Sequence, residues 1–569
     1  MLSTYVALVL ILLVGIVAAR ALSSRDRYLE CIALSLFIAA SAVGLPCVAF
    51  ALIFDVMVSP ELLAIVALAE LAILFTYARR VSALRFKKPD LMVFACAILV
   101  CIAWGMLHHN GWEVDSYSPR VYEVTALRMT TETGFQRGFL ENVKCDDSRE
   151  PDCLHLCKEK GMADDCIERQ QALLNNPLGA HPPGTAVYLI PFALLFGSHG
   201  FTMASIITGL LLFLFTYLLF ERMYPNRVLG IISAFIMTLN PFIIRFIMNH
   251  SHLIGLLFIT ALLYVMHAST TQGRYVFIAY ISAFAVLIRP EYLLMLAVFF
   301  PYLYLIEKRN TVRPYAVLVL IFIFGLVPLA LWNTAISGKP FMHHSQMIDP
   351  GSFNEIEGEP YNDYSFLGLD FHFSGSLNFP FQKKLYRSPG WPYPQPIMAP
   401  LIFLNSFGLI FIGIAGVGVF KGCTRHMLLR VLICAGVLWF LFLSVMESID
   451  DGLTYMFYLP LTLILALGAP LALQLRKRDI AIFFITIMAC VVFIKSAPLL
   501  EVPPDPYEFT RFQVRYLDYN ISVESPESIE QMRQEYAVLH LFPQYDVKKR
   551  VSPEYDPHMK RYYTRVEAE

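Results

Sequence analysis

Gly111-Trp112-Glu113-Val114-Asp115-Ser116-Tyr117 begins a polar stretch of the chain that ends at His181-Pro182-Pro183-Gly184. Long apolar runs lie on both sides of this stretch, whereas the stretch itself is rich in acidic residues and cysteines. Long polar connections between structural elements usually carry function. We therefore expect the apolar runs to hold residues 111–184 against a membrane surface.

The composition is typical of a membrane protein. Of the 569 residues, 57% are hydrophobic and 16% are charged, against about 45–50% and about 25% in a soluble domain. The apolar residues form runs of roughly 17–22, the length that crosses a hydrocarbon core of about 30 Å. The sequence thus predicts an all-α polytopic membrane protein. The net charge of −1 provides no field that would attract nucleic acid, so nucleic acid is not an expected partner.

The apolar runs predict a bundle of about fourteen transmembrane helices. The predicted spans are 4–22, 31–53, 57–77, 90–107, 200–220, 228–248, 253–268, 275–288, 291–306, 314–332, 399–420, 427–446, 454–473 and 480–497. They divide the chain into N-terminal transmembrane helices (1–107), an extracytoplasmic candidate catalytic loop with an interfacial helix (108–199), central transmembrane helices (200–332), an extracytoplasmic loop (333–398), C-terminal transmembrane helices (399–497) and an extracytoplasmic tail (498–569).

The short run 185–197 decides the orientation of everything after it. If it lies along the interface, the basic connections between spans, from Arg20 to Arg478, all fall on one side, which becomes the cytoplasmic side. If it crosses, this pattern breaks. We therefore predict an interfacial helix at 185–197, with both termini extracytoplasmic. The first run, 4–22, is expected to be a retained span, and the expected location is the plasma (inner) membrane of a prokaryote.

Four of the eleven cysteines lie together in the polar stretch, at Cys145, Cys153, Cys157 and Cys166. A zinc site is one interpretation, but the spacing contains no CxxC pair and the neighbours are acidic. Two disulfides in an oxidising compartment fit the pattern better, with three connectivities open. That interpretation also places the loop outside the cytoplasm.

Asp115 lies just beyond the predicted end of the fourth span, with Glu113 and Arg120 close by. A carboxylate at a membrane surface can act as a general base towards an acceptor hydroxyl, although an ordinary solvated loop acid is the simpler interpretation. The two prolines after His181 prevent a helix from starting earlier. The turn they form is expected to present His181 at the membrane surface, unless it serves only as a helix-start signal.

Taken in order, these motifs resemble those of the GT-C superfamily of membrane glycosyltransferases. The resemblance is to the branch with protein O-mannosyltransferases, aminoarabinose transferases and lipopolysaccharide-core galacturonosyltransferases, and it extends over roughly residues 90–340. Besides the acidic motif and the Pro-Pro turn, it rests on Asn240-Pro241, Arg289-Pro290-Glu291, and Trp332-Asn333 followed by Gly338-Lys339-Pro340. The chain departs from the family at Asn249-His250-Ser251-His252, where relatives usually place a second acidic residue. His250 and His252 are either substitute polar or metal contacts or helix-end histidines bonded to water.

The resemblance implies a GT-C-like bundle and inverting transfer of a sugar from a polyprenyl-phosphate-linked donor to a glycan, lipid or protein acceptor, with membrane lipids as further partners. Asp115 would be the base. Phosphate stabilisation calls for a cation, and Arg289 is the first candidate, before Arg245 and Lys339; the alternative is that Arg289 snorkels from a helix end. The remaining candidate substrate-binding residues are Glu113, Tyr117, Arg120, His181, His250, His252 and Glu291. For Glu291 the alternative is that it simply pairs with Arg289. No cofactor is firmly implied, and a divalent metal ion, Mg or Mn, stays open.

Two other classes of function compete with a glycosyltransferase. A transporter or flippase of a lipid or polar solute would often show an internal repeat and ionisable residues at mid-membrane. The chain has no evident repeat, and most of its charges lie at span ends. A non-catalytic assembly partner with the same fold would fit the missing acid at 249–252.

Overall fold

The structure is a computed structural model, and it describes most of the predicted apolar segments. The described residues are 2–22, 28–54, 56, 58–77, 88–109, 122, 126, 182–196, 199–240, 243, 247, 250–268, 274–307, 313–337, 362–366, 369–373, 409–445, 459–473, 549–556 and 561–568. The statements below concern these residues. The other parts of the chain, which include the predicted span 480–497, lie outside them.

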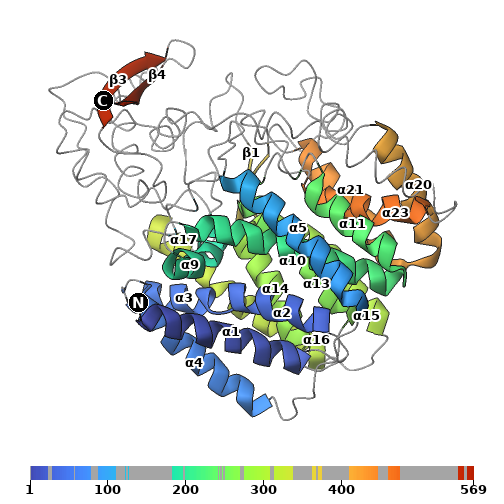
Figure 1. Cartoon of the computed structure of the whole chain (residues 1–569), viewed down its shortest axis with the longest axis horizontal. Coiled ribbons are helices and arrows are strands. Elements are labelled where there is room, and N and C mark those ends of the chain that lie inside the picture. Colours follow the sequence, from blue (N-terminus) through green and yellow to red (C-terminus); the bar gives the residue numbers. More distant parts are fainter. Residues whose placement is uncertain are drawn as a thin grey trace.

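The described chain is predominantly a bundle of α-helices (Figure 1). The helices before the polar stretch are α1 (Leu2–Leu22), α2 (Tyr28–Ser41), α3 (Gly44–Phe54), α4 (Pro60–Tyr77) and α5 (Lys88–His109). After it come α9 (Gly184–Phe196), α10 (Gly200–Met223), α11 (Arg227–Leu239), α13 (His250–Ala268), α14 (Arg274–Ile288), the 3-10 turn η3 (Pro290–Tyr292), α15 (Leu293–Glu307), α16 (Arg313–Gly325) and α17 (Val327–Ser337). The last helices are α20 (Leu409–Arg425), α21 (Met427–Val445), the 3-10 turn η5 (Leu459–Leu461) and α23 (Thr462–Leu473).

Several of these helices are suited to a membrane. Four helical segments of the described chain are long and apolar enough to cross a bilayer: Ser3–Arg20, Tyr28–Ala51, Gly200–Met223 and Tyr315–Trp332. Large apolar side chains are exposed along the outer helices, with Tyr5 of α1, Ile65 of α4, Leu91 of α5 and Phe324 of α16 all more than half exposed. Extended apolar surface of this kind marks contact with lipid or with another protein.

The predicted span 228–248 is not one helix. Its first part forms α11, which ends at Leu239, and Asn240 follows with extended backbone angles. The cause is local, because a residue before proline avoids the helical region and Pro241 has no N–H to continue the ladder. The Asn240 side chain completes the end by donating to the Ile236 carbonyl at 2.8 Å and accepting from the Ile243 N–H at 2.9 Å.

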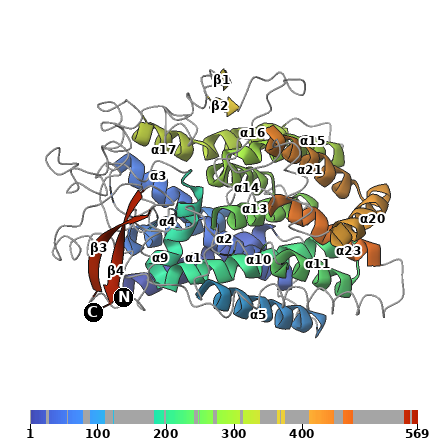
Figure 2. The same cartoon turned by 90° about the horizontal axis from the view of Figure 1, so that it is seen from above.

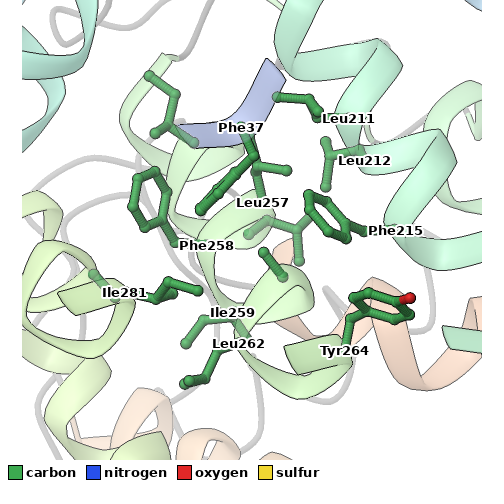
Figure 3. Packing of buried hydrophobic residues seen from close by; sticks show 14 of the residues in the cluster. Phe37, Leu211, Leu212, Phe215, Leu257, Phe258, Ile259, Leu262, Tyr264 and Ile281 are labelled. Atoms are coloured by element: carbon green, nitrogen blue, oxygen red, sulfur yellow. The ribbon is translucent and has the colours of Figure 1, made fainter. Parts of the chain in front are cut away.

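The core lies where α2, α10, α13 and α14 meet (Figure 3). Phe37 of α2 is fully buried, and its ring centroid lies 5.5 Å from that of Phe215 and 4.9 Å from that of Phe258. Phe258 in turn stacks on Phe284 of α14 at 4.6 Å. Aromatic pairs at these separations add to the stabilisation from burial. Figure 2 shows α10 and α13 between the N-terminal helices and α23.

Helix α9 occupies the predicted position of the interfacial helix but is packed differently. A helix lying on a membrane surface keeps one polar, solvated face, whereas Gly184–Ala193 of α9 are buried throughout. The Tyr188 hydroxyl lies 3.2 Å from the Thr208 hydroxyl of α10. A Cβ at Gly44 of α3 would stand 2.5 Å from the Val187 carbonyl oxygen. The apolar sequence of α9 is thus satisfied by neighbouring helices, and the position of α9 along a membrane surface stays a prediction.

Two short hairpins complete the described structure, so the fold is not purely α-helical. Strand β1 (Asn362–Phe366) pairs antiparallel with β2 (Leu369–Phe373), in the predicted loop 333–398. Strand β3 (Lys549–Asp556) pairs antiparallel with β4 (Arg561–Ala568), in the predicted tail. Figure 1 shows β3 and β4 apart from the helices.

Candidate functional site at a helix break

The break between α14 and α15 places two charged side chains in the bundle. Helix α14 ends at Ile288 because Arg289, which precedes Pro290, has an extended backbone with φ −152° and ψ 117°. Pro290 then begins η3. The first N–H groups of a helix have no partner within it, so the missing N–H of proline costs no hydrogen bond at this position. Arg289 therefore projects from an extended residue and Glu291 from the 3-10 turn that follows, rather than both from one continuous α-helix.

Arg289 and Glu291 form a buried ion pair. Their side chains are 9% and 6% exposed, and Nη1 of Arg289 lies 3.6 Å from Oε1 of Glu291. That separation is longer than an N–H···O hydrogen bond of about 2.7–3.2 Å. Within the described part of the chain, the second carboxylate oxygen of Glu291, Oε2, has no hydrogen-bond partner. A buried carboxylate oxygen normally has a donor, so this position favours a ligand that supplies one.

Three side chains from other segments surround this pair. His252, in the first turn of α13, lies close enough to Arg289 for their charges to interact, and it is 1% exposed. Tyr122, also buried, lies within hydrogen-bonding reach of the Ser251 side chain, and both Arg289 and Glu291 act on its hydroxyl. Residues far apart in the sequence thus meet at one place. They come from the polar stretch, at Tyr122, from the start of α13 and from the α14–α15 break.

Tyr292 and Trp439 form one wall of the site. Tyr292 is fully buried and its ring stacks on Trp439 of α21, with centroids 5.5 Å apart and an interplanar angle of 16°. A Cβ at Gly255 of α13 would collide with the Tyr292 phenol, so glycine leaves room for this ring. Among the described residues, the Tyr292 hydroxyl has no hydrogen-bond partner. It is therefore a second polar group beside Glu291 that a ligand could satisfy.

The Pro-Pro turn reaches the same region. Pro182 and Pro183 are buried, and the Val187 N–H donates to the Pro183 carbonyl at 2.9 Å to start α9. Gly184 packs so tightly on α14 that a Cβ there would collide with the backbone of Leu287 and Ile288. These two residues immediately precede Arg289. The turn therefore supports the segment that carries the buried ion pair.

This arrangement can bind and polarise a ligand that has both an anionic and a hydroxylic part. A guanidinium offers several donors in a plane that matches phosphate oxygens. A carboxylate accepts from a hydroxyl, and an imidazole can do either. Because water is largely excluded from the cluster, these interactions are stronger than they would be at a surface.

The structure brings together three of the residues predicted from the sequence: His252, Arg289 and Glu291. His250 is the first residue of α13, on the same turn as His252, and its side chain is not among those described. The other predicted site residues lie outside the described chain: Glu113, Asp115, Tyr117, Arg120, His181, Arg245, Lys339 and the cysteines Cys145, Cys153, Cys157 and Cys166.

Sequence reasoning missed Tyr122, Ser251, Tyr292 and Trp439. Ser251 and Tyr292 are direct neighbours of predicted residues, so a wider window around each motif would have included them. Tyr122 and Trp439 join the site through contacts between distant segments. Nothing in the local sequence distinguishes them from other aromatic residues of the chain.

The described residues offer few ligands for a divalent metal. In the part of the chain that the structure describes, no three His, Cys, Asp or Glu side chains lie close enough together to hold a metal ion. Mg²⁺ is usually bound through one or two carboxylates, with waters and substrate phosphates as its other ligands. A divalent metal at this site therefore stays a prediction.

Comparisons with known protein families, with curated proteins and with solved structures found no match to this chain.

Proposed function

We propose that the chain is a polytopic membrane glycosyltransferase of the GT-C kind, transferring a sugar from a polyprenyl-phosphate-linked donor to an extracytoplasmic acceptor. The apolar helices described above would hold it in the plasma membrane, with both termini extracytoplasmic. The Arg289 cluster would then lie at the outer end of the bundle. Arg222, Arg274 and His426 belong to the opposite end, which supports a basic cytoplasmic side.

The buried Arg289–Glu291 pair is the observation that carries this proposal. Charge at lipid depth is costly and is usually retained for a function. The pair is loose at 3.6 Å, and Oε2 of Glu291 has no hydrogen-bond partner among the described residues. A lipid-linked sugar phosphate supplies the matching groups: phosphate oxygens for Arg289 and sugar hydroxyls for Glu291.

In the proposed reaction, Asp115 and Arg289 each have one role. The carboxylate of Asp115 takes the proton of the acceptor hydroxyl, whose oxygen attacks the anomeric carbon from the face opposite the phosphate. The new C–O bond forms as the bond from the anomeric carbon to the phosphate oxygen breaks. The polyprenyl phosphate leaves with the electron pair, and the configuration inverts. Arg289 stabilises the charge that develops on the leaving phosphate.

The test uses the purified full-length protein in liposomes with a panel of radiolabelled polyprenyl-phosphate sugars. Wild type would release sugar from one donor, in the presence of an acceptor or by hydrolysis. Arg289→Gln and Glu291→Gln are each expected to lose activity by roughly a hundredfold or more. Arg227→Gln is the matched control, because Arg227 is exposed and lies at the start of α11.

Absence of both binding and turnover with every donor would refute the proposal. Full activity in Arg289→Gln and Glu291→Gln would remove the buried pair from the mechanism. The productive donor would identify the sugar.

A transporter is the second candidate, and Glu70 favours it. Glu70 lies in the middle of the apolar helix α4, and its Oε2 is buried with no hydrogen-bond partner in the described chain. An ionisable side chain at such a position often marks a transport path. Uptake of a labelled lipid or solute that is lost in Glu70→Gln but kept in Glu291→Gln would favour transport over glycosyl transfer.

A further inference from the structure

Two neighbouring side chains at the α14–α15 break each have a polar atom without a partner. In the described part of the chain, neither Oε2 of Glu291 nor the hydroxyl of Tyr292 has a hydrogen-bond partner. The Glu291 side chain is 6% exposed, and Tyr292 is fully buried. Buried polar atoms are nearly always hydrogen-bonded, because leaving them unpaired costs free energy. Two such atoms on consecutive residues therefore favour a bound ligand that pairs with both.

Contacts with two helices fix the position of the Tyr292 hydroxyl. The Tyr292 ring stacks on Trp439 of α21 at a centroid distance of 5.5 Å. In addition, a Cβ at Gly255 of α13 would collide with the hydroxyl oxygen. Gly255 comes one helical turn after His252, so the two residues share one face of α13. The hydroxyl is therefore held against the face of α13 that carries His252.

Glu291 and Tyr292 make different demands on a ligand. The Glu291 carboxylate, whose Oε1 lies 3.6 Å from Nη1 of Arg289, can only accept hydrogen bonds, whereas a tyrosine hydroxyl can donate and accept. A sugar hydroxyl satisfies both residues, and an ammonium group satisfies the carboxylate. A carboxylate on the ligand would instead place a second negative charge beside Glu291, where water is largely excluded and repulsion is strong.

The phosphate of a lipid-linked donor does not account for the two unpaired atoms. Phosphate oxygens accept hydrogen bonds and carry negative charge, so they suit Arg289 and would be repelled by Glu291. The sugar is the part of the donor that carries hydroxyl groups. Glu291 and Tyr292 are thus matched to the sugar, and Arg289 is matched to the phosphate.

We propose that Glu291 and Tyr292 select the sugar of the donor, accepting a neutral or amino sugar and rejecting one that carries a carboxylate. This inference rests on the proposed glycosyl transfer and narrows its substrate class. Glu291 accepts a hydrogen bond from a sugar hydroxyl or ammonium group, and Tyr292 hydrogen-bonds to a neighbouring hydroxyl. The rejection comes from an unfavourable contact, because the carboxylate of an acidic sugar would lie next to Glu291.

The test compares four lipids that share one prenyl chain and one phosphate: a hexose donor, an aminohexose donor, a hexuronic acid donor, and the polyprenyl phosphate without a sugar. Their binding to the purified full-length protein is measured in nanodiscs without an acceptor. The hexose and aminohexose donors should bind at least about tenfold more tightly than the hexuronic acid donor, since like charges in a binding site oppose association. This comparison uses wild type alone and needs no variant.

Glu291→Gln tests the source of the rejection. The substitution keeps the size of the side chain, removes its charge and adds N–H groups that can donate to a carboxylate. The variant should therefore bind the hexose donor more weakly than wild type does. It should bind the hexuronic acid donor within about twofold of the hexose donor, because the repulsive contact is gone.

Tyr292→Phe removes only the hydroxyl. It should weaken binding of the hexose and aminohexose donors by roughly two- to tenfold, the usual value of one hydrogen bond, and leave binding of the bare polyprenyl phosphate unchanged. Tyr302→Phe is the matched control. Tyr302 is also a buried tyrosine, but it lies further along α15 and its hydroxyl contacts His267. Binding of all four lipids to this control should stay within about twofold of wild type.

Equal binding of the hexose and hexuronic acid donors by wild type would overturn the inference and leave the proposed transfer standing. Unchanged hexose binding in both Glu291→Gln and Tyr292→Phe would do the same. If Tyr292→Phe lost the bare polyprenyl phosphate as much as the donors, the role of Tyr292 would be structural and the inference would fall. If none of the four lipids bound, the proposed function would fail, and this inference with it.

Discussion

Buried arginines occur at both ends of this helical bundle, but their neighbours differ. Arg289 lies beside Glu291, and His252 and Tyr122 complete a cluster with both charge signs. Arg274 belongs to a cluster in which the charges acting on His267 are all basic. A cluster with both charge signs offers donors and acceptors to a ligand, as the proposed transfer requires, whereas the other end holds the His267–Tyr302 contact between α13 and α15. The comparison therefore sets the proposed site of transfer against an end of the bundle that joins two helices.

The largest expected effect tests whether one end carries the chemistry. Asp115→Asn should abolish transfer, by about 10²–10⁴-fold, because the amide is nearly isosteric with the carboxylate but cannot accept a proton. Membrane insertion should be unchanged. The measurement is sugar release from the productive donor, with Asp450→Asn as the control for a loop acid elsewhere. Retained activity in Asp115→Asn would exclude this residue as the base.

A charge-conserving change at each end should sharpen the contrast. Arg289→Lys should lower transfer by roughly tenfold or more, because lysine keeps the charge but loses the planar pair of donors. Arg274→Lys, at the opposite end of the bundle, should leave the transfer rate within about twofold of wild type, because distant sites act independently. The transfer rate is measured for both variants. An equal or larger loss in Arg274→Lys would contradict the assignment of transfer to the Arg289 end.

The next prediction concerns the stability of the protein, and its expected effect is smaller than the losses of activity above. It tests the packing of the Pro-Pro turn on α14. Gly184→Ala should destabilise the protein by about 1–3 kcal/mol, because the new methyl group meets backbone that cannot rotate away. Thermal unfolding in detergent measures the change. Gly413→Ala is the matched control, since a Cβ at that helical glycine has no heavy atom within 4 Å. Equal stability of the two variants would contradict the tight contact.

The smallest expected effect is at the end of the bundle where Tyr302 contacts His267. Tyr302→Phe removes the hydroxyl that contacts His267 and should cost about 0.5–1.5 kcal/mol, the usual net value of one hydrogen bond. Tyr304→Phe, at an exposed tyrosine two residues away, should cost nothing measurable. Thermal unfolding again distinguishes the two. If both variants unfold like wild type, the His267–Tyr302 contact contributes little to the fold.

The sequence predicts the helices better than their surroundings. The runs at 4–22, 57–77 and 275–288 return as α1, α4 and α14 within a few residues, because apolar length alone defines such segments. Asn240-Pro241 also indicates that α11 ends early. The prediction of one long span followed hydropathy instead and missed this end. Hydropathy likewise cannot distinguish a short helix on a membrane surface from one enclosed by others, which is why the burial of α9 was not foreseen.

For the site, local motifs identified the two charged residues at the helix break, Arg289 and Glu291. Arg289-Pro290-Glu291 is recognisable because proline beside two charges in an apolar region is unusual. The wall formed by Trp439 and the position of Tyr122 depend on contacts between segments more than a hundred residues apart. Such contacts are decided by three-dimensional packing, which leaves no periodic signal along the chain.

The burial of α9 also has a consequence for the order in which the protein assembles. Its 13 residues span about 20 Å as a helix, too little to be left as an independent crossing of a core of about 30 Å. Of the helices around it, α3 is synthesised earlier, but α10 and α14 follow it in the chain. The turn at Pro182–Gly184 can therefore make its final contacts only after α14 has been synthesised. The region around Arg289 thus takes its final form late, once helices that follow the turn in the chain are complete.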